Sequence, residues 1–195
     1  GVFFFFLLLN LKFKNYKFSL LGTSFFILSP RIFAQSFYNP NDIVFMSSII
    51  FIFYFYIKFF QNFKMKYLVY SCIFSSISIC LRPMAIYMPI LFITGLIYIY
   101  FIKEINLNSL LKKLSIFIIL TFVLSYIFNP PIWITPIKII IQQFQWAINS
   151  SVTDILYLGK FYKNTQTPWH YLIVWILVTT PILYLILFFF GILKI

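Results

Sequence analysis

Long apolar runs separated by short polar stretches dominate the chain. The runs cover residues 1–9, 18–29, 43–60, 67–81, 84–102, 114–128 and 169–193. A membrane-spanning helix needs about 20 apolar residues, with a range of roughly 17–25. Three of the runs reach or approach that length, and the run at 18–29 is the least secure span. The pattern predicts an all-α fold, a multi-pass transmembrane helix bundle of about six to seven membrane segments that forms a single domain over residues 1–195.

Composition excludes most other classes of protein. Hydrophobic residues make up 63% of the 195 residues and charged residues only 9%, whereas a soluble domain carries about 25% charged residues. A soluble fold of this size could not bury so much apolar surface. A soluble globular enzyme, a disordered tail, a coiled coil and a disulfide scaffold are therefore excluded, and an integral membrane protein remains.

The basic residues predict how the segments are oriented. The net charge is +12, and the cations lie between apolar runs rather than on one amphipathic face, which argues against nucleic acid as a partner. If each run crosses the membrane once, one side holds ten cations in short loops and the other holds five, mostly in long loops. Short loops rich in Lys and Arg stay in the cytoplasm. The ten are Lys12, Lys14, Lys17, Lys58, Lys64, Lys66, Lys103, Lys112, Lys113 and Lys194, and the five are Arg31, Arg82, Lys138, Lys160 and Lys163.

The predicted outer loops hold most of the polar and irregular sequence. They cover residues 30–42, the positions around 82–83, and a long outward-facing loop at 129–168. Loops of this kind are where function usually resides. Within the 67–81 run, Ser71, Ser75 and Ser78 share one helical face, which indicates either close helix packing or a hydroxyl-lined substrate path.

Asp42 and Arg82 are the outer residues best suited to chemistry. Asp42 is one of three acids, with Glu104 and Asp154, and it stands at a membrane boundary, where an acid is costly unless paired, solvated or functional. Its structural alternative is the N-cap of a helix over 43–60, with Asn39, Pro40 and Asn41 in the turn. Arg82, which precedes Pro83, could neutralise a phosphate, pair with Asp42 or extend to the interface.

His170 is the only histidine. A metal site needs further strong ligands, and on the same predicted side only Asp42 and Asp154 offer any. A divalent metal is left open as a cofactor, with Asp42 and His170 as its candidate ligands. An aromatic belt formed by Trp169, His170 and Tyr171 at the start of the last helix is the competing interpretation.

Three segments carry a resemblance to a known family. They are SPRIFAQSFYNPNDIVF, SISICLRPMAIYMPILF and LGKFYKNTQTPWHYLIVWILVTTPILYLILFFFGI. In their order and topology they resemble the multi-pass GT-C glycosyltransferases, in particular bacterial relatives of dolichyl-phosphate-mannose protein mannosyltransferases and of lipid A aminoarabinose transferases. Each motif is loose on its own. The resemblance covers about residues 20–192, and the three segments lie between residues 29 and 192.

The resemblance implies a membrane glycosyltransferase of the bacterial inner membrane. The donor would be a polyprenyl-phosphate-linked sugar, transferred on the periplasmic face to a lipid, glycan or protein acceptor. Asp42 matches an acid expected to line the sugar or acceptor site, and Arg82 matches a basic residue that could face the donor phosphate. Asn39, Lys160, Lys163 and His170 complete the candidate substrate-binding residues, although His170 stands where relatives often have Tyr.

The resemblance also implies that the principal catalytic acid lies in an outer loop preceding Gly1. On this interpretation the chain is an internal fragment of a longer protein. Two other functions stay open: a transporter or flippase of lipid-linked sugars, and a noncatalytic membrane scaffold. Membrane lipids are expected as partners, and the sequence does not indicate an oligomeric state.

Overall fold

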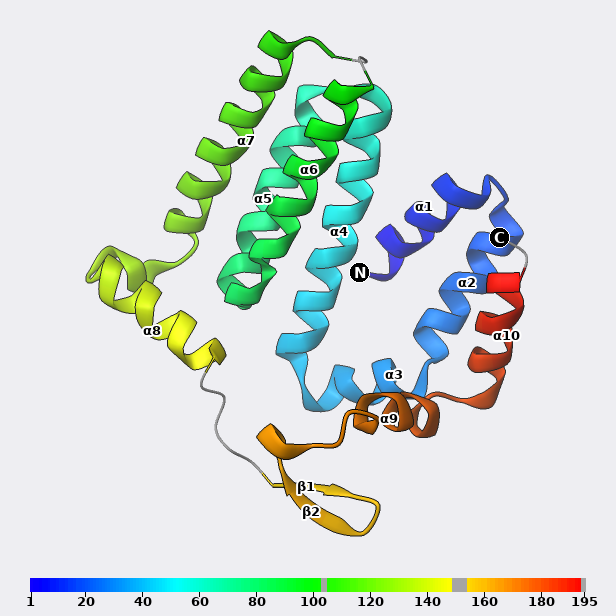
Figure 1. Cartoon of the computed structure of the whole chain (residues 1–195). Coiled ribbons are helices and arrows are strands. Elements are labelled where there is room, and N and C mark those ends of the chain that lie inside the picture. The colour runs from blue at the N-terminus through cyan, green and yellow to red at the C-terminus, as the bar shows by residue number, and fades with distance from the viewer. Residues whose placement is uncertain (103–104, 149–153, 194–195) are drawn as a thin grey trace. The chain divides into compact units, whose positions relative to one another are not determined.

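The computed structural model describes residues 1–102, 105–148 and 154–193, and helices account for most of them. The all-α fold class predicted from the sequence is confirmed. The elements, labelled in Figure 1, are α1 (Val2–Phe13), α2 (Tyr16–Leu28), α3 (Pro30–Tyr38), α4 (Pro40–Asn62), α5 (Met65–Leu81), η1 (Pro83–Ile86), α6 (Tyr87–Phe101), α7 (Leu107–Ile127), η2 (Pro130–Trp133), α8 (Pro136–Ile148), β1 (Asp154–Tyr157), β2 (Lys160–Lys163), η3 (Asn164–Gln166), α9 (Tyr171–Thr179) and α10 (Ile182–Leu193).

Within the single domain expected from the sequence, the chain forms two compact units, Gly1–Ile148 and Asn149–Ile195. The core of the first unit is aromatic and lies between α4, α5, α6 and α7. Phe92 of α6 stacks on Phe117 of α7 with ring centroids 4.1 Å apart, and Tyr56 and Phe59 of α4 pack against Phe92. The other buried members of this core are Ile52, Leu68, Cys72, Met88, Leu96 and Leu110. All four helices contribute to one core and therefore form one bundle.

The serines of α5 lie inside this bundle. Ser71, Ser75, Ser76 and Ser78 are all fully buried. The Ser78 hydroxyl donates to Ser48 Oγ of α4 at 2.7 Å, and the Ser76 hydroxyl donates to the Thr121 carbonyl of α7 at 2.9 Å. Small hydroxyl side chains let helix backbones approach closely and bond across the contact. This arrangement favours the packing interpretation of the serine face over the substrate path.

Of the first three helices, α1 and α3 pack against α4, and α2 packs against α1 and α3. Phe5 of α1 stacks on Phe26 of α2 with centroids 4.3 Å apart, and Phe4 of α1 meets Phe51 of α4 edge-on at 4.6 Å. The short helix α3 was not expected from the sequence. It begins with Pro30, which suits the first helical position, and it exposes Phe33 and Phe37 one turn apart. A short amphipathic helix of this kind suits a membrane surface.

Three segments of the described residues are long and apolar enough to cross a membrane: Pro40–Asn62, Pro83–Phe101 and Leu107–Ile127. A fourth span forms if α9 and α10 are counted together, although they are bent by 113° where Pro181 interrupts the helix. The other predicted runs are helical but shorter: α1, α2 and α5 have 12, 13 and 17 residues. The structure thus places a helix in every predicted run, and three to four of these helical segments meet the length of a span.

The predicted long outer loop contains more regular structure than expected. In the first unit it includes η2 and α8, and in the second unit it includes an antiparallel hairpin that pairs Asp154 with Lys163 and Tyr157 with Lys160. Leu158 and Gly159 form the two-residue turn, both with positive φ, at 49° and 78°. Positive φ at both central positions is the geometry of a type I′ hairpin turn. Gly159 adopts positive φ at little cost, whereas a leucine at position 158 gives no sequence signal for this conformation.

Candidate functional site

Asn39 and Asp42 lie together at the start of α4. Asn39 is the N-cap of this helix: its Oδ1 accepts from the Asp42 backbone N–H at 3.4 Å, and its Nδ2 donates to Asp42 Oδ2 at 2.6 Å. The prediction that Asp42 itself caps a helix over 43–60 is therefore wrong. The helix begins at Pro40, because Asn39 satisfies the first free N–H groups and proline suits the first helical position. Asp42 occupies the first turn, where a negative charge is favourable.

Arg82 approaches Asp42 from the end of α5. It adopts an extended backbone conformation between α5 and η1, because Pro83 disfavours the helical conformation for the residue that precedes it. Its Nη2 donates to Asp42 Oδ1, and the two side chains form a salt bridge. Residues 40 positions apart in the sequence thus meet at one end of the bundle, as the predicted topology required.

The three side chains form a polar cluster that remains accessible. Arg82 and Asp42 keep 51% and 45% of their side-chain surface exposed. A solvent-exposed pair of this kind contributes only about 0–1 kcal/mol to stability. An arginine carries five N–H donors, so the guanidinium has the capacity to bond a further anionic group. The cluster of Asn39, Asp42 and Arg82 is called the outer cluster below.

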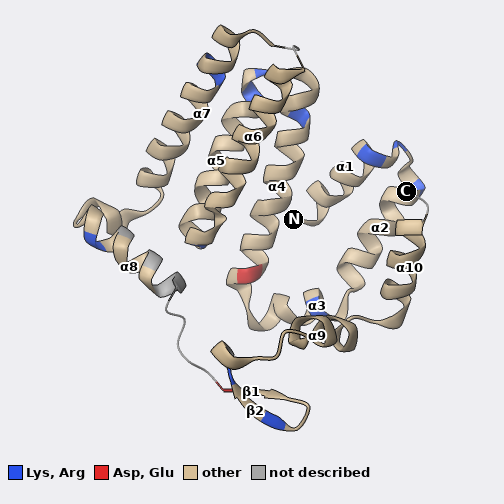
Figure 2. Cartoon of the chain, viewed as in Figure 1, with Lys and Arg blue, Asp and Glu red and all other residues tan. Residues whose placement is uncertain are grey.

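Most lysines of the first unit lie at the opposite end of the helices from the outer cluster, whereas Lys138 lies on α8. Figure 2 shows Asp42 at one end of α4 and basic residues at the other end of the same helix, at the start of α5 and near the start of α7. The α1–α2 turn is also basic and is separated by the length of α2 from α3, which leads into the start of α4. Lys103, Glu104 and Lys194 of the predicted charge pattern fall outside the described residues.

Lys160, Lys163 and His170 lie in the second unit. Lys160 and Lys163 begin and end strand β2, where Lys163 stands opposite Asp154. His170 precedes α9 and packs against aromatic rings. The centroid of its imidazole lies 5.7 Å from the ring centroid of Tyr157 and 5.4 Å from that of Trp169. Tyr157 is buried, and its ring also contacts Tyr171 at 5.1 Å. His170 therefore joins the aromatic group expected as the competing interpretation.

The outer cluster does not have the donor set of a metal site. Both carboxylate oxygens of Asp42 already accept hydrogen bonds, from Arg82 and from Asn39. Among the residues that the structure describes, no three His, Cys, Asp or Glu side chains gather as ligands. Asp42 and His170 lie in separate units.

Sequence reasoning missed one feature of the first unit, a groove lined by aromatic side chains of α1, α4 and α5. Its residues come from three apolar runs, and each looks like an ordinary lipid-facing position. The spacing of Tyr67, Tyr70 and Phe74 along one face of α5 is the signal that was available.

Comparison with known proteins identifies no relative of the chain. No family model, no curated protein and no solved structure matches the chain. The class of protein therefore rests on the chain itself. Its long apolar helices, its composition and the separation of charge along the first unit indicate an integral membrane protein.

Proposed function

We propose that the chain is part of a membrane glycosyltransferase of the bacterial inner membrane, which uses a polyprenyl-phosphate-linked sugar on the periplasmic face. The observation that carries the proposal is the outer cluster, in which an amide, a carboxylate and a guanidinium from two separate sequence motifs meet at the end of α4 away from the lysines of the α4–α5 turn. The motifs that resemble the GT-C family supply these three residues.

The chemistry of the proposed reaction assigns a task to each side chain. Transfer breaks the bond between the sugar C1 and the phosphate oxygen, forms a bond from the acceptor oxygen to C1, and releases polyprenyl phosphate. The guanidinium of Arg82 would neutralise the departing phosphate, because arginine binds phosphate with paired, charge-assisted hydrogen bonds. Asp42 would hold this guanidinium in place, and Asn39 would hold Asp42. The proton of the acceptor goes to a carboxylate base, which the family resemblance places in a loop that precedes Gly1.

This proposal is tested by sugar transfer in membranes that contain the whole gene product. Radiolabelled sugar transferred from a polyprenyl-phosphate donor is measured for the native protein and for Arg82→Gln and Asp42→Asn. Because the cluster supports the leaving group, we expect both changes to lower the transfer rate about 100-fold. Lys138→Gln, on the same predicted side, is the control and should retain the native rate. Native rates in both cluster variants would contradict the proposal.

A transporter of lipid-linked sugars is the second candidate, and one observation favours it. The last span is broken at Thr180–Pro181, where α9 and α10 meet at 113°, and interrupted helices are typical of transporter binding sites. The two functions differ in their products. A transporter moves the intact lipid-linked sugar across the bilayer and leaves the bond to phosphate unbroken, whereas a noncatalytic scaffold would tolerate changes to Asp42 and Arg82.

A further inference from the structure

The groove between α1, α4 and α5 lies within the first unit. It has a volume of about 520 Å³ and is lined by Phe4, Leu7, Tyr54, Phe55, Tyr67, Tyr70, Ile73 and Phe74. Ligand pockets have volumes of roughly 300–1,000 Å³. The groove is open and its lining is mostly apolar, which suits a hydrocarbon chain.

Aromatic contacts hold the groove in shape. Phe55 of α4 stacks on Phe74 of α5 at 5.5 Å with an interplanar angle of 9°, and it also contacts Tyr70 at 4.9 Å. Phe4 of α1 meets Tyr54 edge-on at 5.1 Å. The rings of three helices therefore support one another, and the groove is built by packed side chains rather than by a loose gap.

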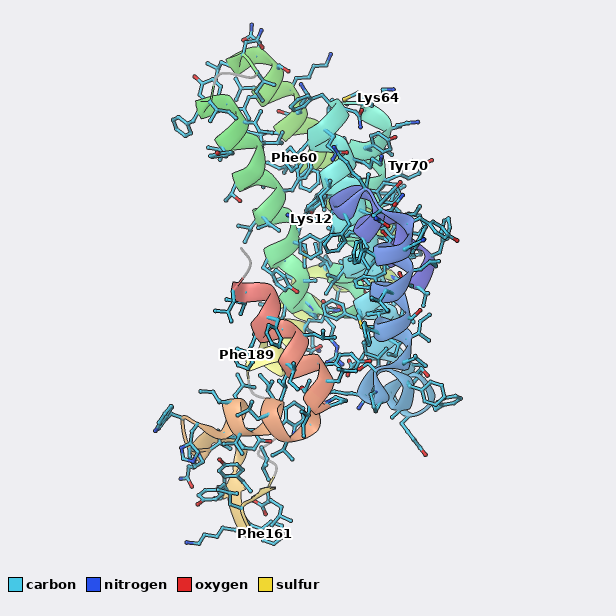
Figure 3. The ribbon with its side chains drawn as sticks, turned by 90° about the vertical axis from the view of Figure 1, so that its right-hand side faces the viewer. Lys12, Phe60, Lys64, Tyr70, Phe161 and Phe189 are labelled. Carbon is cyan, nitrogen blue, oxygen red and sulfur yellow. The ribbon has the colours of Figure 1, made fainter. Side chains whose placement is uncertain are left out.

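Lysines adjoin the part of the groove that the start of α5 forms. The Nζ atom of Lys66 lies 5.1 Å from the centre of the Tyr67 ring, which lines the groove. Lys64 is the residue before α5, and Lys12 follows Leu7 on α1 by five residues, which is about 7.5 Å along the helix. Figure 3 shows Lys64 near the top of this view and Lys12 lower, past Tyr70. The described acids, Asp42 and Asp154, lie at the far end of α4 and in the other unit.

We propose that this groove binds an anionic phospholipid of the membrane leaflet next to the lysines, with an acyl chain between α1 and α5 and its phosphate beside Lys64 and Lys66. The apolar lining matches the acyl chain, and the cationic end matches a headgroup that carries net negative charge. A zwitterionic lipid gains the contact of its acyl chain with the apolar lining but little attraction between its headgroup and the lysines. This binding site is separate from the outer cluster, which lies at the other end of α4, and it does not depend on the proposed glycosyltransferase activity.

Native mass spectrometry of the purified protein tests the lipid preference. Dioleoyl phosphatidylglycerol and dioleoyl phosphatidylcholine, which share acyl chains and differ in net charge, are added in equal amounts. We expect the native protein to retain phosphatidylglycerol preferentially. In the double variant Lys64→Gln/Lys66→Gln, the ratio of retained phosphatidylglycerol to retained phosphatidylcholine should fall about tenfold, because each lysine near an anionic surface contributes appreciably to binding.

The control variant Lys112→Gln/Lys113→Gln removes the same charge from the same end of the bundle, on α7, which does not line the groove. It should keep the native preference. Equal retention of the two lipids by the native protein, or equal losses in the two double variants, would overturn the proposal, because the preference would then be absent or would follow net charge alone.

A second pair of variants tests whether the acyl chain occupies the groove. Ile73→Trp places a large ring in the groove and should reduce retention of both lipids, whereas Ile90→Trp, at an exposed position of α6, should not. Circular dichroism checks that both variants keep the native helix content. If a folded Ile73→Trp variant retained both lipids at the native level, the acyl chain would lie outside the groove.

Discussion

Tyr56 connects three helices through a single hydroxyl group. This hydroxyl lies 2.9 Å from Ser75 Oγ of α5 and 3.0 Å from the Met88 carbonyl at the start of α6, while its ring packs against Phe92. Only 4% of Tyr56 is exposed. Water cannot replace either bond in the bundle interior, so the hydroxyl fixes how α4, α5 and α6 meet.

Tyr56→Phe removes the hydroxyl and keeps the ring. We expect it to lower the free energy of unfolding by about 1 kcal/mol, since Ser75 and Met88 lose a partner while the aromatic packing persists. Reversible unfolding of the purified protein in mixed micelles with increasing dodecyl sulfate measures the change. Tyr98→Phe, at a position of α6 that is 66% exposed, is the control and should have no measurable effect. Equal stability of the two variants would contradict the role assigned to Tyr56.

Gly95 sets the contact between α4 and α6. A Cβ atom at this position would lie 2.7 Å from Cζ and 3.1 Å from Cε2 of Phe60, so any side chain larger than hydrogen must displace that ring. Small residues at such contacts let membrane helices pack closely. At the scale of the element, the position of α6 therefore depends on the absence of a side chain at Gly95.

Gly95→Leu should force α6 away from Phe60. We expect a loss of about 1–3 kcal/mol in the free energy of unfolding, as for other overpacked contacts, measured by the same unfolding experiment. Gly191→Leu is the matched control, because nothing lies within 4 Å of a Cβ built there. Combining Gly95→Leu with Phe60→Ala should recover part of the loss. Equal effects of the two glycine substitutions would refute the close contact.

The sequence predicts the apolar helices well and the short elements poorly. Every apolar run is helical because burial or lipid leaves the backbone no partner except itself. Helix α3 and the hairpin are short, and their signals are single residues such as Pro30 and Gly159. Helix α8 had a signal in the helical spacing of Ile137, Ile141, Phe144 and Ile148, which sequence reasoning passed over.

The proximity of Asp42 and Arg82 in the outer cluster was predictable from the sequence, whereas the N-cap of α4 was not. Alternating spans place Asp42 and Arg82 at one end of the bundle, so their proximity follows from topology. The identity of the N-cap did not follow, because Asn39 and Asp42 are both good caps and only the local geometry decides between them.

Over the whole first unit, most of the lysines lie at one end of the helices, whereas Arg31, Arg82 and Lys138 belong to the predicted outer side. The lysines of the α4–α5 turn and of the α7 start lie at one end, and the outer cluster lies at the other. Because short cationic loops remain in the cytoplasm, the outer cluster should face the opposite side of the membrane.

Cysteine labelling in intact cells tests this orientation. A membrane-impermeant maleimide should react with Ser36→Cys on α3 without disruption of the membrane, and with Asn62→Cys at the end of α4 only after permeabilisation. The native Cys72 is buried and Cys80 is half-buried inside the helical bundle, so the unsubstituted protein supplies the background signal. Reaction of both introduced cysteines from the same side would contradict the predicted topology.

Binding of a polyprenyl phosphate to the protein in nanodiscs tests the central claim most directly, since the claim is that the outer cluster receives the donor phosphate. We expect Arg82→Gln to weaken binding at least tenfold, because a charge-assisted hydrogen bond contributes about 1.5–3 kcal/mol. Lys138→Gln should bind as the native protein does. Unchanged affinity in Arg82→Gln would contradict the assignment of the outer cluster as a phosphate-binding site.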